Sequence, residues 1–206
     1  MGIIRRTRVV KISLPPDPDF APIWDKICRG AVLGADKSYI ASTGSGGARS
    51  LQYRTSGKWH FEINLGTGAG ATQYAMVGIS YGTPWDSGYS LWGDVNNTCP
   101  IYGYPGGPGW RSAYAYGRLT YISGNFEDAG FGDNVVVGFD LNADMNTLRV
   151  RTTTMDATYQ INGRKQTDPI YVIGGDGGWG SIGNMRLIAQ EPFTWTPMEG
   201  YLPFCE

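Results

Sequence analysis

The chain contains a single histidine, His60, so any catalytic triad or Cys-His pair that it forms must use that residue. His60 lies in a segment in which Trp59 and Phe61 alternate with Lys58 and Glu62. This period of two places His60 on the polar face of a strand, opposite the two aromatic rings. We therefore predict a half-exposed strand residue rather than a catalytic base. One histidine also excludes zinc sites with several histidine ligands.

Acidic and amide side chains that could bind a cation recur at every second position: Asp140, Asn142, Asp144 and Asn146. A helix–loop–helix calcium loop that starts in this way also requires glycine at its sixth position and glutamate at its twelfth. Those positions hold Met145 and Arg151. Because Asn and Asp side chains bond to nearby backbone groups in tight turns, the pattern predicts a hairpin turn, no metal site and no cofactor.

A glycosidase needs two carboxylates about 5 to 10 Å apart across a cleft. The residues two positions from Glu62 are a histidine and an asparagine, so the clearest strand offers no such pair. Cys28, Cys99 and Cys205 have no paired spacing, so neither a zinc site nor a disulfide framework follows, and whether they form a disulfide stays open. The sequence therefore predicts no catalytic residues and no enzyme.

Residues 81–121 hold half of the Trp and Tyr residues of the chain, among many Gly and Pro residues. A long segment without periodicity is commonly a functional loop, and so many aromatic rings argue against disorder. Trp and Tyr dominate binding hot spots because they offer rigid contact area. The predicted partner-binding residues are Trp85, Tyr89, Trp92, Tyr102, Tyr104 and Trp110. The alternative is that these rings pack as a second small core.

Residues 1–24 are predicted to form an extended arm with a Pro-rich hinge. Residues 3–14 have the composition of a strand, and the prolines at 15–18 then prevent both a helix and sheet pairing. Such a strand can pair with a sheet edge in its own chain or in a neighbour, so we expect a homo-oligomer in which the arm serves assembly. The basic residues of the arm are Arg5, Arg6, Arg8 and Lys11. They suit docking on an acidic partner or on the acidic body, with a solvated arm as the alternative.

The composition excludes several classes of protein. A net charge of −1 argues against a general nucleic-acid binder, because phosphate contacts need a basic face. No apolar run approaches the roughly 18 residues of a membrane span, and the N-terminal residues lack the apolar core of a signal peptide. Apolar residues at 41% and aromatic residues at 13% are too many for a disordered chain. We expect a folded domain without membrane insertion.

The rest of the chain shows short strand patterns. Alternation over 57–65 predicts a strand with one buried face, and the apolar run 135–141 predicts a strand covered on both faces. Asn162-Gly163 predicts a hairpin turn between short strands at 158–161 and 169–173. No useful window keeps a helical period of 3.6, so the sequence predicts an all-β fold, in the form of a two-sheet β-sandwich.

Four motifs resemble those of the SPRY (B30.2-like) domain family and occur in the family's order. They are Gly57-Lys58-Trp59-His60-Phe61-Glu62, Val77-Gly78-Ile79-Ser80, residues 132–141 with the following Thr147-Leu148, and Phe193-Thr194-Trp195-Thr196-Pro197-Met198-Glu199-Gly200-Tyr201. The resemblance implies a bent, antiparallel, concanavalin-like jelly roll over residues 25–206, with binding loops and no catalytic machinery. Two differences from the family's usual pattern are the late turn at Asn162-Gly163 and the long segment 81–121.

The Gly/Tyr-rich excursion and the Pro-x-x-Gly-Tyr ending are similar to those of SPRY-like proteins of tailed bacteriophages. This resemblance implies a non-enzymatic virion structural protein, such as a tail fibre or another tail-associated, receptor-binding adhesin. Its aromatic loops would bind a host-surface glycan or protein, and its arm would bind other virion proteins. The alternative is a capsid- or tail-decoration (cement) protein whose arm and loops clamp neighbouring subunits. A carbohydrate-active enzyme is the third hypothesis.

Overall fold

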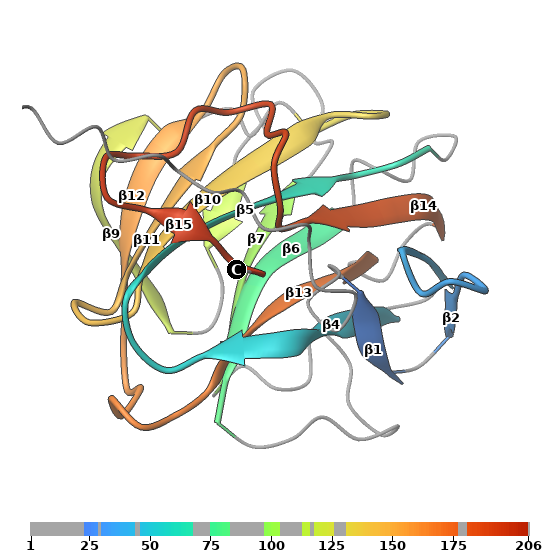
Figure 1. Ribbon diagram of the computed structural model, residues 1–206. Coiled ribbons are helices and arrows are strands. Elements are labelled where there is room, and N and C mark those ends of the chain that lie inside the picture. The colour runs from blue at the N-terminus through green and yellow to red at the C-terminus, as the bar shows by residue number, and fades with distance from the viewer. Residues whose placement is uncertain are drawn as a thin grey trace, which may run out of the picture.

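Short runs of β-branched and aromatic residues, separated by Gly, Pro and Asn turns, form strands in a computed structural model of the chain (Figure 1). The structure describes residues 23–28, 30–43, 46–67, 75–82, 97–103, 113–115, 118–125, 131–176 and 181–205. In these ranges the strands form two sheets and no helix, which confirms the all-β fold class. Accordingly, the same ranges contain no helix long and apolar enough to cross a membrane.

The six-stranded sheet has the order β1-β4-β13-β6-β7-β8, and neighbouring strands are antiparallel. Its strands are β1 (Trp24–Cys28), β4 (Gly47–Arg54), β13 (Ile170–Asp176), β6 (Ala75–Tyr81), β7 (Thr98–Gly103) and β8 (Ala113–Ala115). The segment 81–121, expected to be an ordered excursion, thus contributes two strands to this sheet where it is described.

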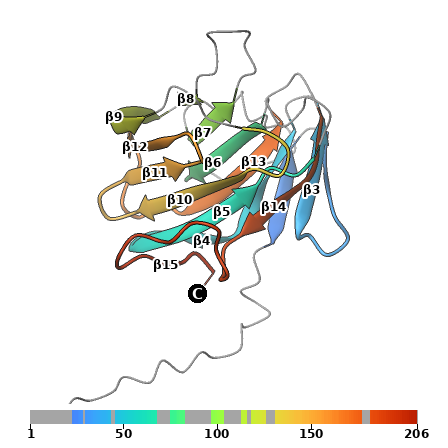
Figure 2. The ribbon, with the colours of Figure 1, turned by 90° about the horizontal axis from the view of Figure 1, so that it is seen from above.

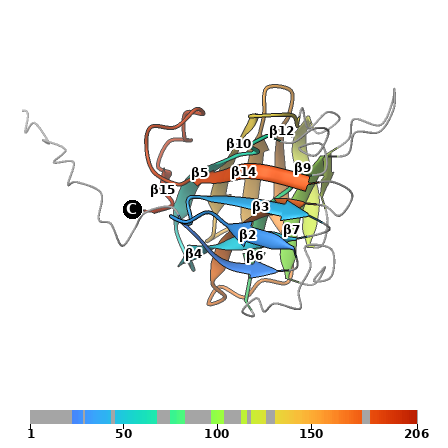
Figure 3. The same cartoon turned by 90° about the vertical axis from the view of Figure 1, so that its right-hand side faces the viewer.

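The nine-stranded sheet follows the order β2-β3-β14-β5-β10-β11-β12-β9 and packs against the first sheet (Figure 2). Its strands are β2 (Ala31–Leu33), β3 (Tyr39–Thr43), β14 (Ser181–Ile188), β5 (Lys58–Asn64), β10 (Val136–Asn142), β11 (Thr147–Arg151), β12 (Asp156–Ile161) and β9 (Leu119–Asn125). At one end of the sheet β2, β3 and β14 lie side by side (Figure 3). The short β15 (Leu202–Pro203) pairs parallel with β5, on the edge that β14 leaves free.

The apolar faces of the two sheets form the core. Phe61 of β5 pairs with Phe139 of β10, and their rings stack with centroids 4.8 Å apart. Val77 and Ile79 of β6 and Val172 of β13 belong to the same fully buried cluster. The strands predicted at 57–65 and 135–141 are therefore β5 and β10, and the apolar positions of each face the other sheet.

The Asn162-Gly163 turn does not join two paired strands, so that prediction is wrong. β12 belongs to the nine-stranded sheet and β13 to the six-stranded sheet, and β12 pairs with β11 and β9 instead. The connection crosses from one sheet to the other. Arg164, 6% exposed, anchors it by donating hydrogen bonds to the carbonyl oxygens of Ala143, Thr55 and Asp168.

The hairpin predicted from the alternating Asp and Asn residues is confirmed as the turn between β10 and β11. Asn142 Oδ1 accepts a hydrogen bond from the backbone N–H of Met145 at 3.1 Å. Asn146 has a φ of 54°, in the left-handed region that Asn tolerates. Asp144 Oδ1 accepts the N–H of Gly57 at 2.9 Å. These oxygens therefore serve the turn and the neighbouring loop.

Candidate functional site

The antiparallel register of β5, β10 and β11 gathers charged side chains on the outer face of the nine-stranded sheet. They form two rows across the strands, Glu62–Gly138–Arg151 and His60–Asp140–Arg149. The residues between these positions in β5 and β10 point into the core. The result is a polar cluster in the middle of a sheet whose other face is apolar.

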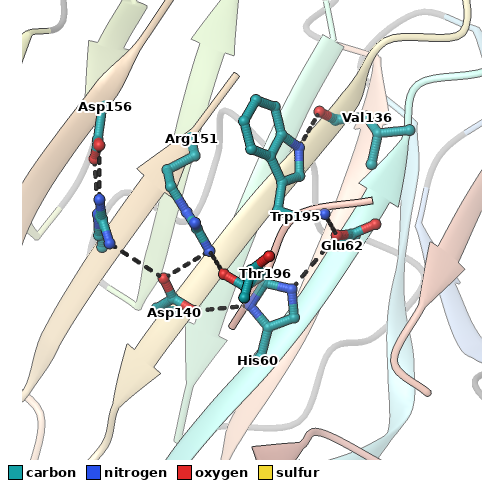
Figure 4. Close-up of polar contacts among 9 residues, drawn as sticks. His60, Glu62, Val136, Asp140, Arg151, Asp156, Trp195 and Thr196 are labelled. Carbon is teal, nitrogen blue, oxygen red and sulfur yellow. Dashed lines mark hydrogen bonds and ion pairs between the residues drawn. The ribbon is translucent and has the colours of Figure 1, made fainter. Parts of the chain in front are cut away.

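His60 lies at the centre of this cluster (Figure 4). Its Nδ1 is 2.7 Å from Oδ1 of Asp140, and its Nε2 is 3.5 Å from Oε1 of Glu62. The edge of Phe193 packs against the imidazole, with ring centroids 4.5 Å apart, and His60 is fully buried. Burial lowers the pKa of His60, but the bonds to Asp140 and Glu62 outweigh burial, so the pKa lies above its ordinary value.

Glu62 is held by the backbone of the C-terminal segment, residues 189–201, which connects β14 to β15. The N–H of Thr194 donates to Oε2 at 2.9 Å, and the N–H of Trp195 donates to Oε1 at 2.5 Å. Burial raises the pKa of Glu62, but the hydrogen bonds from His60 and these two amides lower it by more. The pKa of Glu62 therefore lies below its ordinary value. The carboxylate thus binds the C-terminal segment to the sheet.

Asp140 and Arg151 extend the cluster toward the next strand. Arg151 Nη2 forms an ion pair with Asp140 Oδ2 at 2.9 Å and donates to the carbonyl oxygen of Thr196 at 3.0 Å. Arg149 lies 3.8 Å from the same carboxylate oxygen and forms two hydrogen bonds of 2.7 Å with Asp156. Six ionisable side chains and the C-terminal backbone therefore form one connected network (Figure 4).

Gly138 provides the space in which the C-terminal segment is seated. A Cβ atom at this position would lie 2.7 Å from Cδ1 of Trp195, closer than carbon atoms can approach. The indole occupies the place of the missing side chain, and its Nε1 donates to the carbonyl oxygen of Val136 at 3.0 Å. In Figure 1 the red C-terminal segment accordingly runs in front of β5 and β10.

The prediction that His60 is half-exposed is wrong. The alternation in β5 correctly places His60 opposite Phe61, but the C-terminal segment covers this second face, so both faces are buried. Sequence reasoning therefore missed the network of His60, Glu62 and Asp140. Two signals were present in the sequence, namely a glycine at 138 within a β-branched run and the aromatic motif at 193–201.

The cluster combines a histidine with a carboxylate, as general-base pairs do, but both nitrogens of His60 face carboxylates and the ring is enclosed. Within the described ranges, no group of three His, Cys, Asp or Glu side chains is arranged to hold a metal ion. Cys99 and Cys205 are free, buried thiols, and burial raises the pKa of each to about 12. The network is built to hold the C-terminal segment in place.

Most of the predicted partner-binding residues lie outside the described residues: Trp85, Tyr89, Trp92, Tyr104 and Trp110, together with Arg5, Arg6, Arg8 and Lys11 of the arm. Tyr102 lies in β7, where its backbone pairs with Met76 and Tyr114. The structure therefore describes the six-stranded sheet to which the segment 81–121 contributes β7 and β8.

No protein-family model and no curated protein matches the chain. Among solved structures, the chain is similar to the SPRY domain of human HERC1, with 12% identity, a TM-score of 0.56 and alignment over 80% of this chain and 96% of that one. It is similar also to the PSpry domain of TRIM65, with 12% identity, a TM-score of 0.56 and coverage of 82% and 90%. The fold is a SPRY-like β-sandwich.

Proposed function

We propose that this protein is a non-enzymatic binding module of a tailed-phage virion, a tail-associated adhesin that contacts the host surface through its aromatic segment. The observation that carries this proposal is the SPRY-like sandwich in which His60, Glu62 and Asp140 are buried beneath the C-terminal segment. Such a scaffold supports binding loops, and in the described residues the histidine and the two carboxylates beside it are enclosed. Fold alone does not fix function, so the Trp- and Tyr-rich composition of 81–121 supplies the second support.

The proposal places the contact residues at Trp85, Tyr89, Trp92, Tyr102, Tyr104 and Trp110. Aromatic rings stack on the apolar faces of sugar rings and fill protein hot spots, so a surface glycan or a surface protein suits them equally. The N-terminal arm, with its four basic residues, would attach the module to other virion proteins.

Binding of the purified protein to intact host cells and to extracted surface glycans tests the proposal. We expect Trp85→Ala and Trp110→Ala each to weaken binding by about tenfold or more, as hot-spot aromatic residues do. Val32→Ala is the matched control, because Val32 is 64% exposed but lies in β2, outside the aromatic segment. A wild-type protein that is present in purified particles but binds neither cells nor glycans would contradict the adhesin role and favour a decoration protein.

A further inference from the structure

A second feature lies on the outer face of the six-stranded sheet, away from the network around His60. In β13, Val172 pairs with Ile79 and points into the core, whereas Tyr171 pairs with Ser80 and points outward. The neighbouring β4 pairs with β13 at Tyr53 and at Arg49, with an irregular register between these two positions. The side chains of Tyr53 and Arg49 both contact the ring of Tyr171 on this outer face.

Among the described residues, Arg49 is a buried cation that has no polar partner. It is 6% exposed, and its Nε and Nη1 are enclosed without a hydrogen bond. In the described part of the chain its one specific contact is with the ring of Tyr171, whose centroid lies 3.9 Å from the guanidinium carbon. Arg164 is equally buried but donates to several carbonyl oxygens, so burial alone does not account for the state of Arg49.

An unpaired buried charge destabilises a folded protein, because the lost hydration is not replaced. An unsatisfied buried polar group therefore calls for an explanation, and a ligand that completes its hydrogen bonds supplies one. The guanidinium carbon lies over the ring of Tyr171, and Nη2 is the one nitrogen that is not among its enclosed atoms. This arrangement presents a preorganised donor, and the ligand that matches it is a carboxylate.

The surroundings of Arg49 fit a protein ligand. Tyr53 is 52% exposed and lies 5.5 Å from Tyr171 between ring centroids, and Leu51 in the same strand is 45% exposed. Tyr and Arg are enriched in the centres of protein interfaces, where an apolar surface surrounds a few polar groups. The first 14 residues of the chain do not match this site, because they carry four basic residues and no acidic one; the acidic residues of the arm are Asp17 and Asp19 of its hinge.

We propose that Arg49, Tyr171, Tyr53 and Leu51 form a docking site for an acidic segment of a partner protein. A Glu or Asp carboxylate of the partner binds the guanidinium of Arg49, and apolar side chains on either side of that residue cover Tyr53 and Leu51. None of these four residues belongs to the segment 81–121, and the docking site does not depend on the adhesin role.

Fluorescence anisotropy with short labelled peptides tests the docking site on the full chain. Leu alternates with Glu in one peptide and with Gln in its neutral counterpart. We expect the Glu peptide to bind about tenfold more tightly or better, as a charge-assisted hydrogen bond implies, and Arg49→Met to abolish this preference. Arg186→Met is the matched control, because Arg186 also lies over a tyrosine ring, that of Tyr39, but in the other sheet.

The melting temperature of Arg49→Met separates docking from a structural role. We expect it to equal or exceed that of the wild type, because the substitution removes an unpaired buried charge. Equal binding of the two peptides by the wild-type protein would overturn the proposal whether or not any variant folds. Self-association of the wild type that Arg49→Met abolishes would also overturn it, by assigning the surface to a second copy. Loss of cell binding in Trp85→Ala with peptide binding intact would show that the two sites are independent.

Discussion

At the scale of the residue, His60 lies between two carboxylates, each of which can accept a hydrogen bond from it. A neutral imidazole donates from one nitrogen only, whereas a protonated ring donates from both. With Asp140 at 2.7 Å from Nδ1 and Glu62 at 3.5 Å from Nε2, the protonated ring satisfies both acids. The raised pKa of His60 and the lowered pKa of Glu62 express this mutual stabilisation.

The pH dependence of stability follows from these shifts. Because the pKa of His60 is raised on folding, its contribution is complete below its ordinary value of 6.5 and is lost as the pH rises through the folded pKa. Because the pKa of Glu62 is lowered, its contribution is complete above its ordinary value of 4.5 and is lost as the pH falls through the folded pKa. We therefore expect the network to stabilise the fold most between these two values.

Two measurements check this expectation. The chain has one histidine, so its imidazole proton resonance in an NMR titration reports the pKa of His60 without further assignment. We expect a midpoint above 6.5. In urea unfolding we expect a decline in stability as the pH rises from 6.5 through that midpoint, and no such decline in His60→Asn. A midpoint at or below 6.5 would show that the carboxylates do not outweigh burial.

At the scale of the element, the sequence predicts features that depend on neighbouring residues in the chain. It misses contacts between residues that are far apart in the chain. Alternation in β5 identifies the strand and its core face, because Phe61 and Ile63 are each fully buried as predicted. The burial of the opposite face depends on Trp195, more than 130 residues away along the chain. The turn at Asn162-Gly163 is likewise a local signal, which does not specify that the next strand joins the other sheet. Which sheet β13 joins is decided by how its side chains pack against the other strands.

The fit of the C-terminal segment on β10 predicts a sharp difference between two glycine substitutions. Gly138→Ala should lower the free energy of unfolding by about 1–3 kcal/mol, because the new methyl group overlaps the ring of Trp195. Gly132→Ala is the control, since the nearest atom to its Cβ would be Cγ2 of Val135 at an ordinary 3.7 Å. Urea unfolding measures both. In a Trp195→Ala background the cost of Gly138→Ala should largely disappear, and a cost that persists would place the strain elsewhere.

At the scale of the whole molecule, the described strands form both sheets from β1 onward, and of the residues assigned to the arm only Trp24 lies in a described strand. β1 begins at Trp24, which is fully buried, and pairs with β4 at the edge of the six-stranded sheet. The C-terminal segment returns to β5 and covers the outer face of the other sheet. Because residues 1–24 were predicted to serve attachment, we expect folding of the body to be separable from assembly.

Deletion of residues 2–20 tests that separation. The shortened chain should keep the melting temperature of the full chain to within a few degrees, because the strands from β1 onward form both sheets and the core. Sedimentation should show loss of the oligomer, and the shortened chain should be absent from purified particles, because the basic strand that would reach a neighbour is gone. A shortened chain that still assembles and enters particles would contradict the role of the arm and move attachment to the body. A chain that no longer folds would instead show that the arm belongs to the sandwich.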